Sequence, residues 1–117
     1  MAASAGDIIK SWGRTSGIEP TPYMRIYASG AETKYVSLRG VIRPGINNFT
    51  LAMQAIGATV TPSLSIYVPS GKEDPATFPW HDYTAIAPNE LRHFSPAFGF
   101  YLKLVFSGKG QLMVTSL

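Results

Sequence analysis

The sequence predicts one all-β domain, an antiparallel β-sandwich that follows a short N-terminal arm. Two observations lead to this prediction. From Pro22 onward, apolar residues alternate with polar ones, and side chains that alternate along a strand point to opposite faces of a sheet. The alternating segments are separated by Gly, Pro and Ser residues, which are typical of turns. A length of 117 residues fits one domain, so we expect the arm over residues 1–20 and the sandwich over residues 21–117.

Six segments have the period of two that strands require. In each of them the apolar residues occupy every second position, so one side of each expected strand can face a core. Short strands at this spacing indicate a sandwich or a barrel. The expected inward-facing residues are Met24, Ile26 and Ala28; Val36 and Leu38; Phe49, Leu51, Met53 and Ala55; Leu64, Ile66 and Val68; Phe98, Phe100, Leu102, Leu104 and Phe106; and Leu112 and Val114.

The C-terminal part of the sequence predicts a hairpin. Residues 98–106 and 111–117 both alternate, and Ser107–Gly110 joins them with two glycines. A Gly-rich connection of this length is common between adjacent antiparallel strands. We therefore expect these last two strands to pair with each other.

Residues 69–97 are less regular, because five prolines interrupt them. Proline removes a hydrogen-bond donor from a sheet, so this stretch is expected to be one long connection with a strand over residues 80–86 and a shorter one over residues 91–95. Long loops on a rigid scaffold are where binding surfaces commonly lie.

The expected arm carries one apolar cluster, formed by Ile8, Ile9 and Trp12, and glycines and a proline follow it closely. We expect a short edge strand or a single helical turn near Asp7–Ser11. An apolar arm gains stability by packing on a neighbouring subunit, so these three residues are candidates for an interface. Deletion of residues 1–20 is then expected to weaken assembly and leave the domain folded.

Composition limits the function classes. Hydrophobic residues make up 45% of the chain and charged residues 15%, with a net charge of +3. The basic residues are scattered, so a nucleic-acid partner is not expected. There is no cysteine, which excludes disulfides and cysteine-based metal or catalytic sites. No segment is long and apolar enough for a transmembrane span, and the first residues do not read as a signal peptide.

Catalysis has little support in the sequence. His81 is followed by Asp82, but neighbouring residues of a strand face opposite sides, so the pair cannot easily share a site. His93 is the only other histidine, and no Gly-x-Ser-x-Gly motif supplies an activated serine. Calcium-loop and phosphate-loop motifs are also missing. We predict no catalytic residue, no metal site and no cofactor, and we regard a small hydrolase using His81, Asp82 or His93 as the weakest alternative.

Five tyrosines occupy the phase opposite to the expected core residues. Tyr combines a large contact area with a hydrogen-bonding hydroxyl, which suits protein interfaces. The alternative is that these tyrosines form cross-strand pairs or are covered within the domain. The interface candidates on this reasoning are Tyr23, Tyr27, Tyr35, Tyr67 and Tyr101.

A second group of aromatic residues lies among the prolines. Trp80, His81 and Tyr83 form a possible carbohydrate-stacking site, and a carbohydrate-binding module is therefore the alternative to an assembly protein. The plainer interpretation is that Trp80 fills one end of the sandwich.

Three segments together resemble a known group of proteins: Leu64-Ser-Ile-Tyr-Val-Pro-Ser-Gly71, Phe78-Pro-Trp-His-Asp-Tyr83, and the aromatic strand from Phe98 to Phe106 with its glycine turn. Their order resembles that in small, jelly-roll-like β-sandwich proteins of tailed-phage virions. The resemblance covers about residues 35–117, and the turn before Trp80 is longer here than in that pattern. It implies a jelly-roll-like fold and a role in capsid decoration or as a tail or head-fibre part, and it implies no catalytic residue.

The sequence thus leads to one expected function, a non-enzymatic structural protein of a virion. We expect it to act through protein–protein assembly, as a homo-oligomer or bound to a larger viral shell or tail, without a nucleic-acid or membrane partner. Its expected location is the virion, after assembly in the host cytoplasm.

Overall fold

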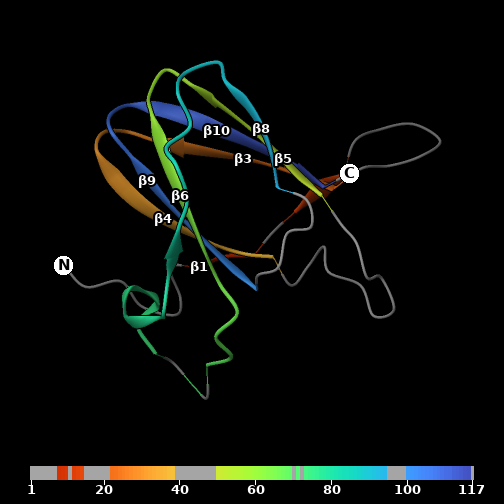
Figure 1. Cartoon of the computed structure of the whole chain (residues 1–117), viewed down its shortest axis with the longest axis vertical. Helices are drawn as coiled ribbons and strands as arrows, with labels where there is room; N and C mark the ends of the chain where they lie inside the picture. Colours follow the sequence, from red (N-terminus) through yellow and green to blue (C-terminus); the bar gives the residue numbers. More distant parts are fainter. Residues whose placement is uncertain are drawn as a thin grey trace.

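The computed structural model describes residues 8–10, 12–14, 22–38, 50–69, 71, 73–94 and 100–116. Within these ranges the chain forms an all-β sandwich of two sheets (Figure 1), which confirms the predicted fold class. None of these residues belongs to a helix that is long and apolar enough to cross a membrane. The elements are β1 (Ile8–Ile9), β2 (Gly13–Arg14), β3 (Pro22–Ala28), β4 (Glu32–Ser37), β5 (Leu51–Ile56), β6 (Val60–Ser65), the 3₁₀ turn η2 (Pro75–Thr77), β7 (His81–Asp82), β8 (Leu91–Phe94), β9 (Tyr101–Phe106) and β10 (Gly110–Ser116).

The strand order is that of a jelly roll. Sheet A has the order β1-β4-β9-β6-β7, and sheet B has the order β2-β3-β10-β5-β8. Four antiparallel pairs, β3–β10, β4–β9, β5–β8 and β6–β7, fold the chain back on itself as one long ribbon. Rolling this ribbon brings β10 beside β5 and β9 beside β6. Two antiparallel sheets built in this way are the jelly-roll arrangement.

The predicted C-terminal hairpin is wrong. β9 lies in sheet A and β10 lies in sheet B, so the connection at 107–109 crosses from one layer to the other. The connections from β3 to β4 and from β5 to β6 cross in the same way. The physical reason is the core: Leu104 and Leu112 are both fully buried, and two strands on opposite sides of one core satisfy that pattern as well as two paired strands do.

The core lies between the sheets and consists mainly of the residues expected to face inward. Ile26, Leu51, Leu102 and Val114 are all buried in it. The prediction was wrong for Ile66 and Val68, which are 67% and 61% exposed. β6 begins earlier than expected, at Val60, and ends at Ser65, so these two residues lie beyond the sheet.

The N-terminal segment joins both sheets. β1 pairs in parallel with β4 and β2 pairs antiparallel with β3, so the expected edge strand near Ile8 is present. Ile9 and Trp12 pack against the main core, and the Trp12 indole Nε1 donates a hydrogen bond to the Ser37 carbonyl at 2.8 Å. The described part of the arm therefore packs on the sandwich of its own chain.

Candidate functional site

The outer face of sheet B presents a row of aromatic and apolar side chains, which we call the tyrosine face. Strand register places Tyr23, Arg25 and Tyr27 of β3 opposite Thr115, Met113 and Gln111 of β10. The same face continues across β5 and β8, because β10 pairs with β5 and β5 pairs with β8. The tyrosine face consists of Tyr23, Arg25, Tyr27, Ala52, Gln54, Ile56, Leu91, His93, Gln111, Met113 and Thr115.

Three large residues of the tyrosine face are well exposed. Tyr23 is 42%, Tyr27 is 61% and Leu91 is 57% exposed. A Cβ atom on Gly13 of β2 would lie 2.9 Å from the ring of Tyr23, so this ring lies over the edge strand of the sheet. The structure thus brings two of the predicted interface tyrosines together on one flat surface.

Arg25 lies between the two tyrosines. Its guanidinium contacts the Tyr27 hydroxyl at 3.5 Å and the Met113 sulfur at 3.6 Å. Both are neutral and weak acceptors. Within the described ranges Arg25 forms no ion pair, and the basic residues that do form one are Lys34, Arg92 and Lys103.

Sheet A has a different outer face, because the chain covers the part of it around Tyr35 and Tyr101, while Thr33 and Val105 of the same face stay exposed. Residues 66–69 and 73–82, which we call the outer layer, follow β6 and end in β7 at the edge of sheet A, and two of their aromatic rings pack on the outer face of this sheet. Phe78 packs against Tyr101 with ring centroids 5.3 Å apart, and Trp80 packs against Tyr35 at 5.8 Å. Tyr35 and Tyr101 are only 9% and 7% exposed, so these two predicted interface residues belong to a second, small core and not to the surface.

Polar contacts fix the outer layer in place. The Ser63 hydroxyl donates to Asp82 Oδ1 at 2.5 Å, and Lys103 Nζ lies 4.0 Å from the same oxygen and 5.6 Å from the centre of the Trp80 ring. The Trp80 indole donates to the Pro75 carbonyl at 2.9 Å. The Asp74 carboxylate caps η2 by accepting from the Ala76 amide at 2.9 Å. The layer is therefore tied to sheet A at several points.

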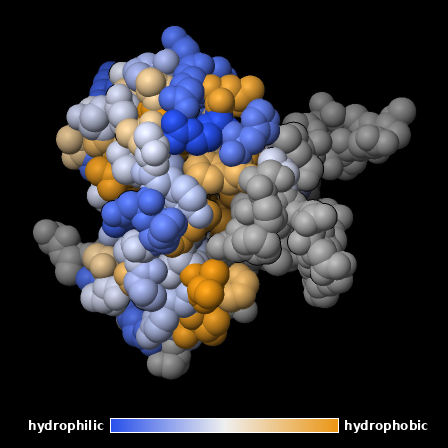
Figure 2. All heavy atoms as spheres, viewed as in Figure 1, coloured by the Kyte–Doolittle hydropathy of each residue, from blue (hydrophilic) through white to orange (hydrophobic). Residues whose placement is uncertain are grey.

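Ile66 and Val68 are the exposed apolar part of the outer layer. Figure 2 shows hydrophobic colour along the segment that leaves β6, which Figure 1 draws in light green. Between them Tyr67, another predicted interface residue, is 37% exposed. Its hydroxyl donates to Glu73 Oε2 at 2.5 Å, and this hydrogen bond raises the pKa of Tyr67 above its ordinary value.

A shallow hollow lies at the sandwich edge formed by the β7–β8 connection and β8. It has a volume of about 470 Å³ and is lined by Tyr83, Thr84, Arg92, His93 and Phe94. The Tyr83 ring meets the Phe94 ring edge-on at 5.0 Å, and the His81 ring meets Tyr83 at the same distance.

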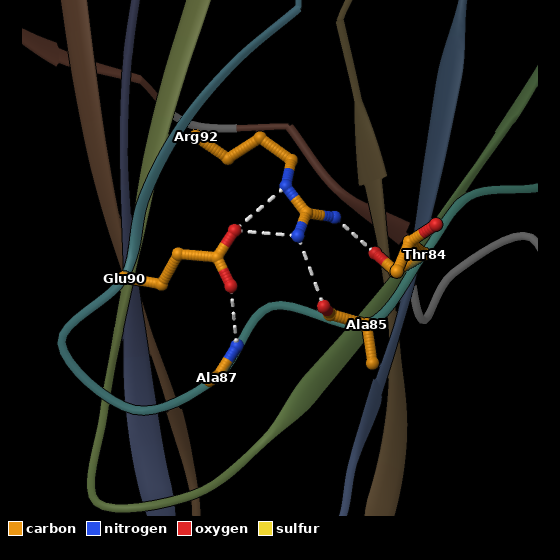
Figure 3. A network of polar contacts seen from close by, with 5 residues as sticks. All are labelled: Thr84, Ala85, Ala87, Glu90 and Arg92. Atoms are coloured by element: carbon orange, nitrogen blue, oxygen red, sulfur yellow. Dashed lines mark hydrogen bonds and ion pairs between the residues drawn. The ribbon is translucent and has the colours of Figure 1, made fainter.

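Arg92 organises this edge (Figure 3). Its guanidinium donates to Glu90 Oε2 at 2.5 Å and to the carbonyls of Thr84 and Ala85, while the other oxygen of Glu90 accepts from the Ala87 amide at 3.1 Å. Hydrogen bonds from the Ala87 amide and from Arg92 lower the pKa of Glu90, and the charge of Arg92 adds to this effect. The network therefore ties the β7–β8 connection to Arg92 of β8, and all three guanidinium nitrogens of Arg92 donate a hydrogen bond.

The Glu90 contact should make the stability of this edge depend on pH. Folding lowers the pKa of the Glu90 carboxyl group from its ordinary value of 4.5. The ionised group therefore stabilises the folded state at pH values above 4.5, and this contribution is lost as the pH falls through the lowered pKa. We expect Glu90→Gln to melt at a lower temperature than the wild type at pH 7, and the gap to shrink below pH 4.5. Thermal unfolding at several pH values measures this. Because the pair is exposed, high salt should also narrow the gap; a gap that widens in acid would contradict the assignment.

The residues considered for catalysis do not meet. Asp82 faces Ser63 on the outer side of sheet A, His81 faces Tyr83, and His93 lies on the tyrosine face. The side chains of the neighbours His81 and Asp82 therefore face opposite sides of the strand, as the alternation predicts. In the part of the chain that the structure describes, no group of three or more His, Asp or Glu residues could hold a metal ion.

The predicted carbohydrate site is divided. Tyr83 lines the edge hollow, and the His81 ring packs edge-on against Tyr83. The Trp80 ring instead packs between Tyr35, Phe78 and Lys103 on the outer side of sheet A. Only His81 and Tyr83 are therefore left as candidates for contact with a sugar.

Sequence reasoning missed Arg25, Met113 and Leu91 as members of a candidate surface. The alternation contained the signal for the first of them, because Arg25 shares its phase with Tyr23 and Tyr27. β3 pairs with β10, which brings Met113 beside Arg25. This pairing could not be predicted from the local sequence.

Comparison with known proteins gives no match: no family model, curated protein or solved structure corresponds to this chain. The candidate surface is therefore argued from the geometry of the described residues.

Proposed function

We propose that this chain is a non-enzymatic structural module that assembles with copies of itself through the tyrosine face. One observation carries the proposal: the chain itself covers the outward tyrosines of sheet A, Tyr35 and Tyr101, whereas sheet B exposes Tyr23, Tyr27 and Leu91 on its outer side. Tyr, Arg and Met are enriched in protein interfaces, and Tyr and Arg are frequent among the residues that contribute most to binding. An exposed patch with this composition is typical of an interaction site.

We further propose that the assembly is part of a virion, as capsid decoration or as a tail or head accessory component attached to a larger shell or tail. The resemblance of residues 64–71, 78–83 and 98–106 to small phage-virion sandwiches supports this proposal. The jelly-roll topology is compatible with it, because jelly rolls are found in viral capsid domains and in lectins. Topology alone does not decide function. A role in a virion therefore requires that copies of this chain assemble with one another.

The experiment is sedimentation velocity over a wide range of protein concentration. We expect the wild type to associate as the concentration rises, and the double variant Tyr23→Ser with Tyr27→Ser to stay monomeric, because the two largest exposed rings of the face are removed. Tyr83→Ser is the matched control, since Tyr83 is 36% exposed but lies at the edge hollow. It should associate as the wild type does.

The result is decisive only for folded proteins, so circular dichroism accompanies each variant. A wild type that remains monomeric at every concentration would refute self-assembly. Equal association of the double variant and the wild type would show that another surface is used.

A further inference from the structure

Building on the proposed function, we propose that copies associate head to tail: the tyrosine face of one copy binds the outer layer of the next, with Arg25 paired to Asp82 of the neighbour. This names the surface that the tyrosine face recognises. It differs from the simpler arrangement in which two identical faces meet.

The charges of the tyrosine face disfavour contact between two identical faces. Arg25 lies in the middle row of the face, where register aligns it with Met113, Gln54 and Leu91. The outward residues of β3, β10, β5 and β8 that form the face include no carboxylate. Two such faces in contact would remove two guanidinium groups from water without supplying a carboxylate to either, which is unfavourable for a buried charge.

The outer layer offers the missing carboxylates. It contains Glu73, Asp74 and Asp82, and the side chain of Asp82 is 72% exposed. Ser63 and Lys103 both contact Oδ1 of Asp82, and no described residue forms a hydrogen bond or ion pair with Oδ2. A carboxylate accepts several hydrogen bonds, so Asp82 keeps an oxygen for an incoming guanidinium. An Arg–carboxylate pair in a desolvated interface is also among the stronger polar contacts.

The outer layer has an apolar part to match the tyrosines. Ile66 and Val68 are 67% and 61% exposed. Ile66 follows Ser63 of β6 by three residues, and Ser63 pairs with Asp82 of β7. The apolar part and the acidic part are therefore only about three residues apart along the strand direction. Tyr23, Tyr27 and Leu91 can cover this aliphatic surface while Arg25 reaches the carboxylate.

The two surfaces lie on opposite sides of the molecule. The tyrosine face is the outer side of sheet B, and Phe78 and Trp80 of the outer layer pack on the outer side of sheet A. Contacts between unlike surfaces continue from copy to copy, and they give a ring when the rotation closes and a filament when it does not. Head-to-tail association therefore produces the repeated arrangement that a shell or tail component requires.

The test uses two variants that each damage one surface. Arg25→Glu places a carboxylate on the tyrosine face, and Ile66→Glu places one on the outer layer. Both positions are exposed, so both chains should fold, which circular dichroism checks. At a concentration where the wild type is assembled, we expect each variant alone to be monomeric in sedimentation velocity and native mass spectrometry.

Mixing the two variants gives the distinguishing result. The intact tyrosine face of Ile66→Glu can bind the intact outer layer of Arg25→Glu, and no further copy can add to either end. We expect a 1:1 mixture to form a dimer of one copy of each variant and nothing larger. Thr33→Glu is the control. Thr33 is an exposed residue of β4 that belongs to neither surface, so this variant should assemble as the wild type does.

Other outcomes overturn the inference. If Ile66→Glu assembles normally while Arg25→Glu does not, identical faces meet, and the proposed function stands without the head-to-tail arrangement. A mixture that stays monomeric also refutes it. A wild type that never associates refutes the proposed function itself.

Discussion

Phe106→Ala is expected to lower the free energy of unfolding by about 3–5 kcal/mol, the usual range for truncating a buried Phe. Phe106 is 1% exposed and belongs to β9, the central strand of sheet A, where register places it between Glu32 of β4 and Val60 of β6. The loss removes a large part of the roughly 5–15 kcal/mol by which a domain of this kind is stable.

Urea unfolding measures this loss. The midpoint should fall while the slope stays nearly constant, because the variant loses stability without a change in the surface exposed on unfolding. Val105→Ala is the matched control in the same strand, since Val105 is 39% exposed, and a surface change of this kind is usually within about 0.5 kcal/mol. Equal losses for the two variants would contradict the assignment of Phe106 to the core.

Gly110→Ala is expected to destabilise the protein by about 1–3 kcal/mol through overpacking. A Cβ atom at Gly110 would lie 2.6 Å from the Ile56 carbonyl oxygen and 2.9 Å from the Ala58 amide nitrogen. Both are backbone atoms, which cannot rotate away as a side chain can. A Cβ atom at the nearby Gly57 would lie 3.3 Å from the Cα atom of Gly110, so the connection from β5 to β6 approaches the start of β10 closely.

Gly108→Ala is the control for this substitution. No non-neighbouring atom lies within 4 Å of a Cβ placed at Gly108, and this residue belongs to the connection that leads from β9 into β10. Chemical unfolding of both variants gives the comparison. Similar stabilities would show that β10 does not pack against the β5–β6 connection as closely as the structure indicates.

Alternation predicted the inward side of most strands correctly, because burial acts on each strand separately. Met24, Leu102 and Leu112 are buried as their phase requires. The partner of each strand was not predictable in this way. The turn residues after Phe106 suit a hairpin and a crossing between sheets equally well, and only the long-range pairing of β10 with β3 and β5 decides between them.

The candidate surface was predictable only in part, for the same reason. Tyr23, Tyr27, Tyr35 and Tyr101 share the outward phase, and the sequence treats them alike. The outer layer separates them, because it returns over sheet A and covers Tyr35 and Tyr101 while it leaves sheet B open. This return depends on contacts such as Asp82 with Ser63, which join positions far apart in the chain.

The pairing of Tyr23 with Thr115 joins positions near opposite ends of the described chain. β9 is the central strand of sheet A and β10 that of sheet B, so sheet A cannot be completed on the ribosome before β9 has left the exit tunnel, nor sheet B before β10 has left it. Proteins dominated by such distant pairings fold slowly. Until then the edges of β3, β4, β5 and β6 that later pair with β9 or β10 stay open, and these edges are the ones on which nascent chains of this protein would aggregate.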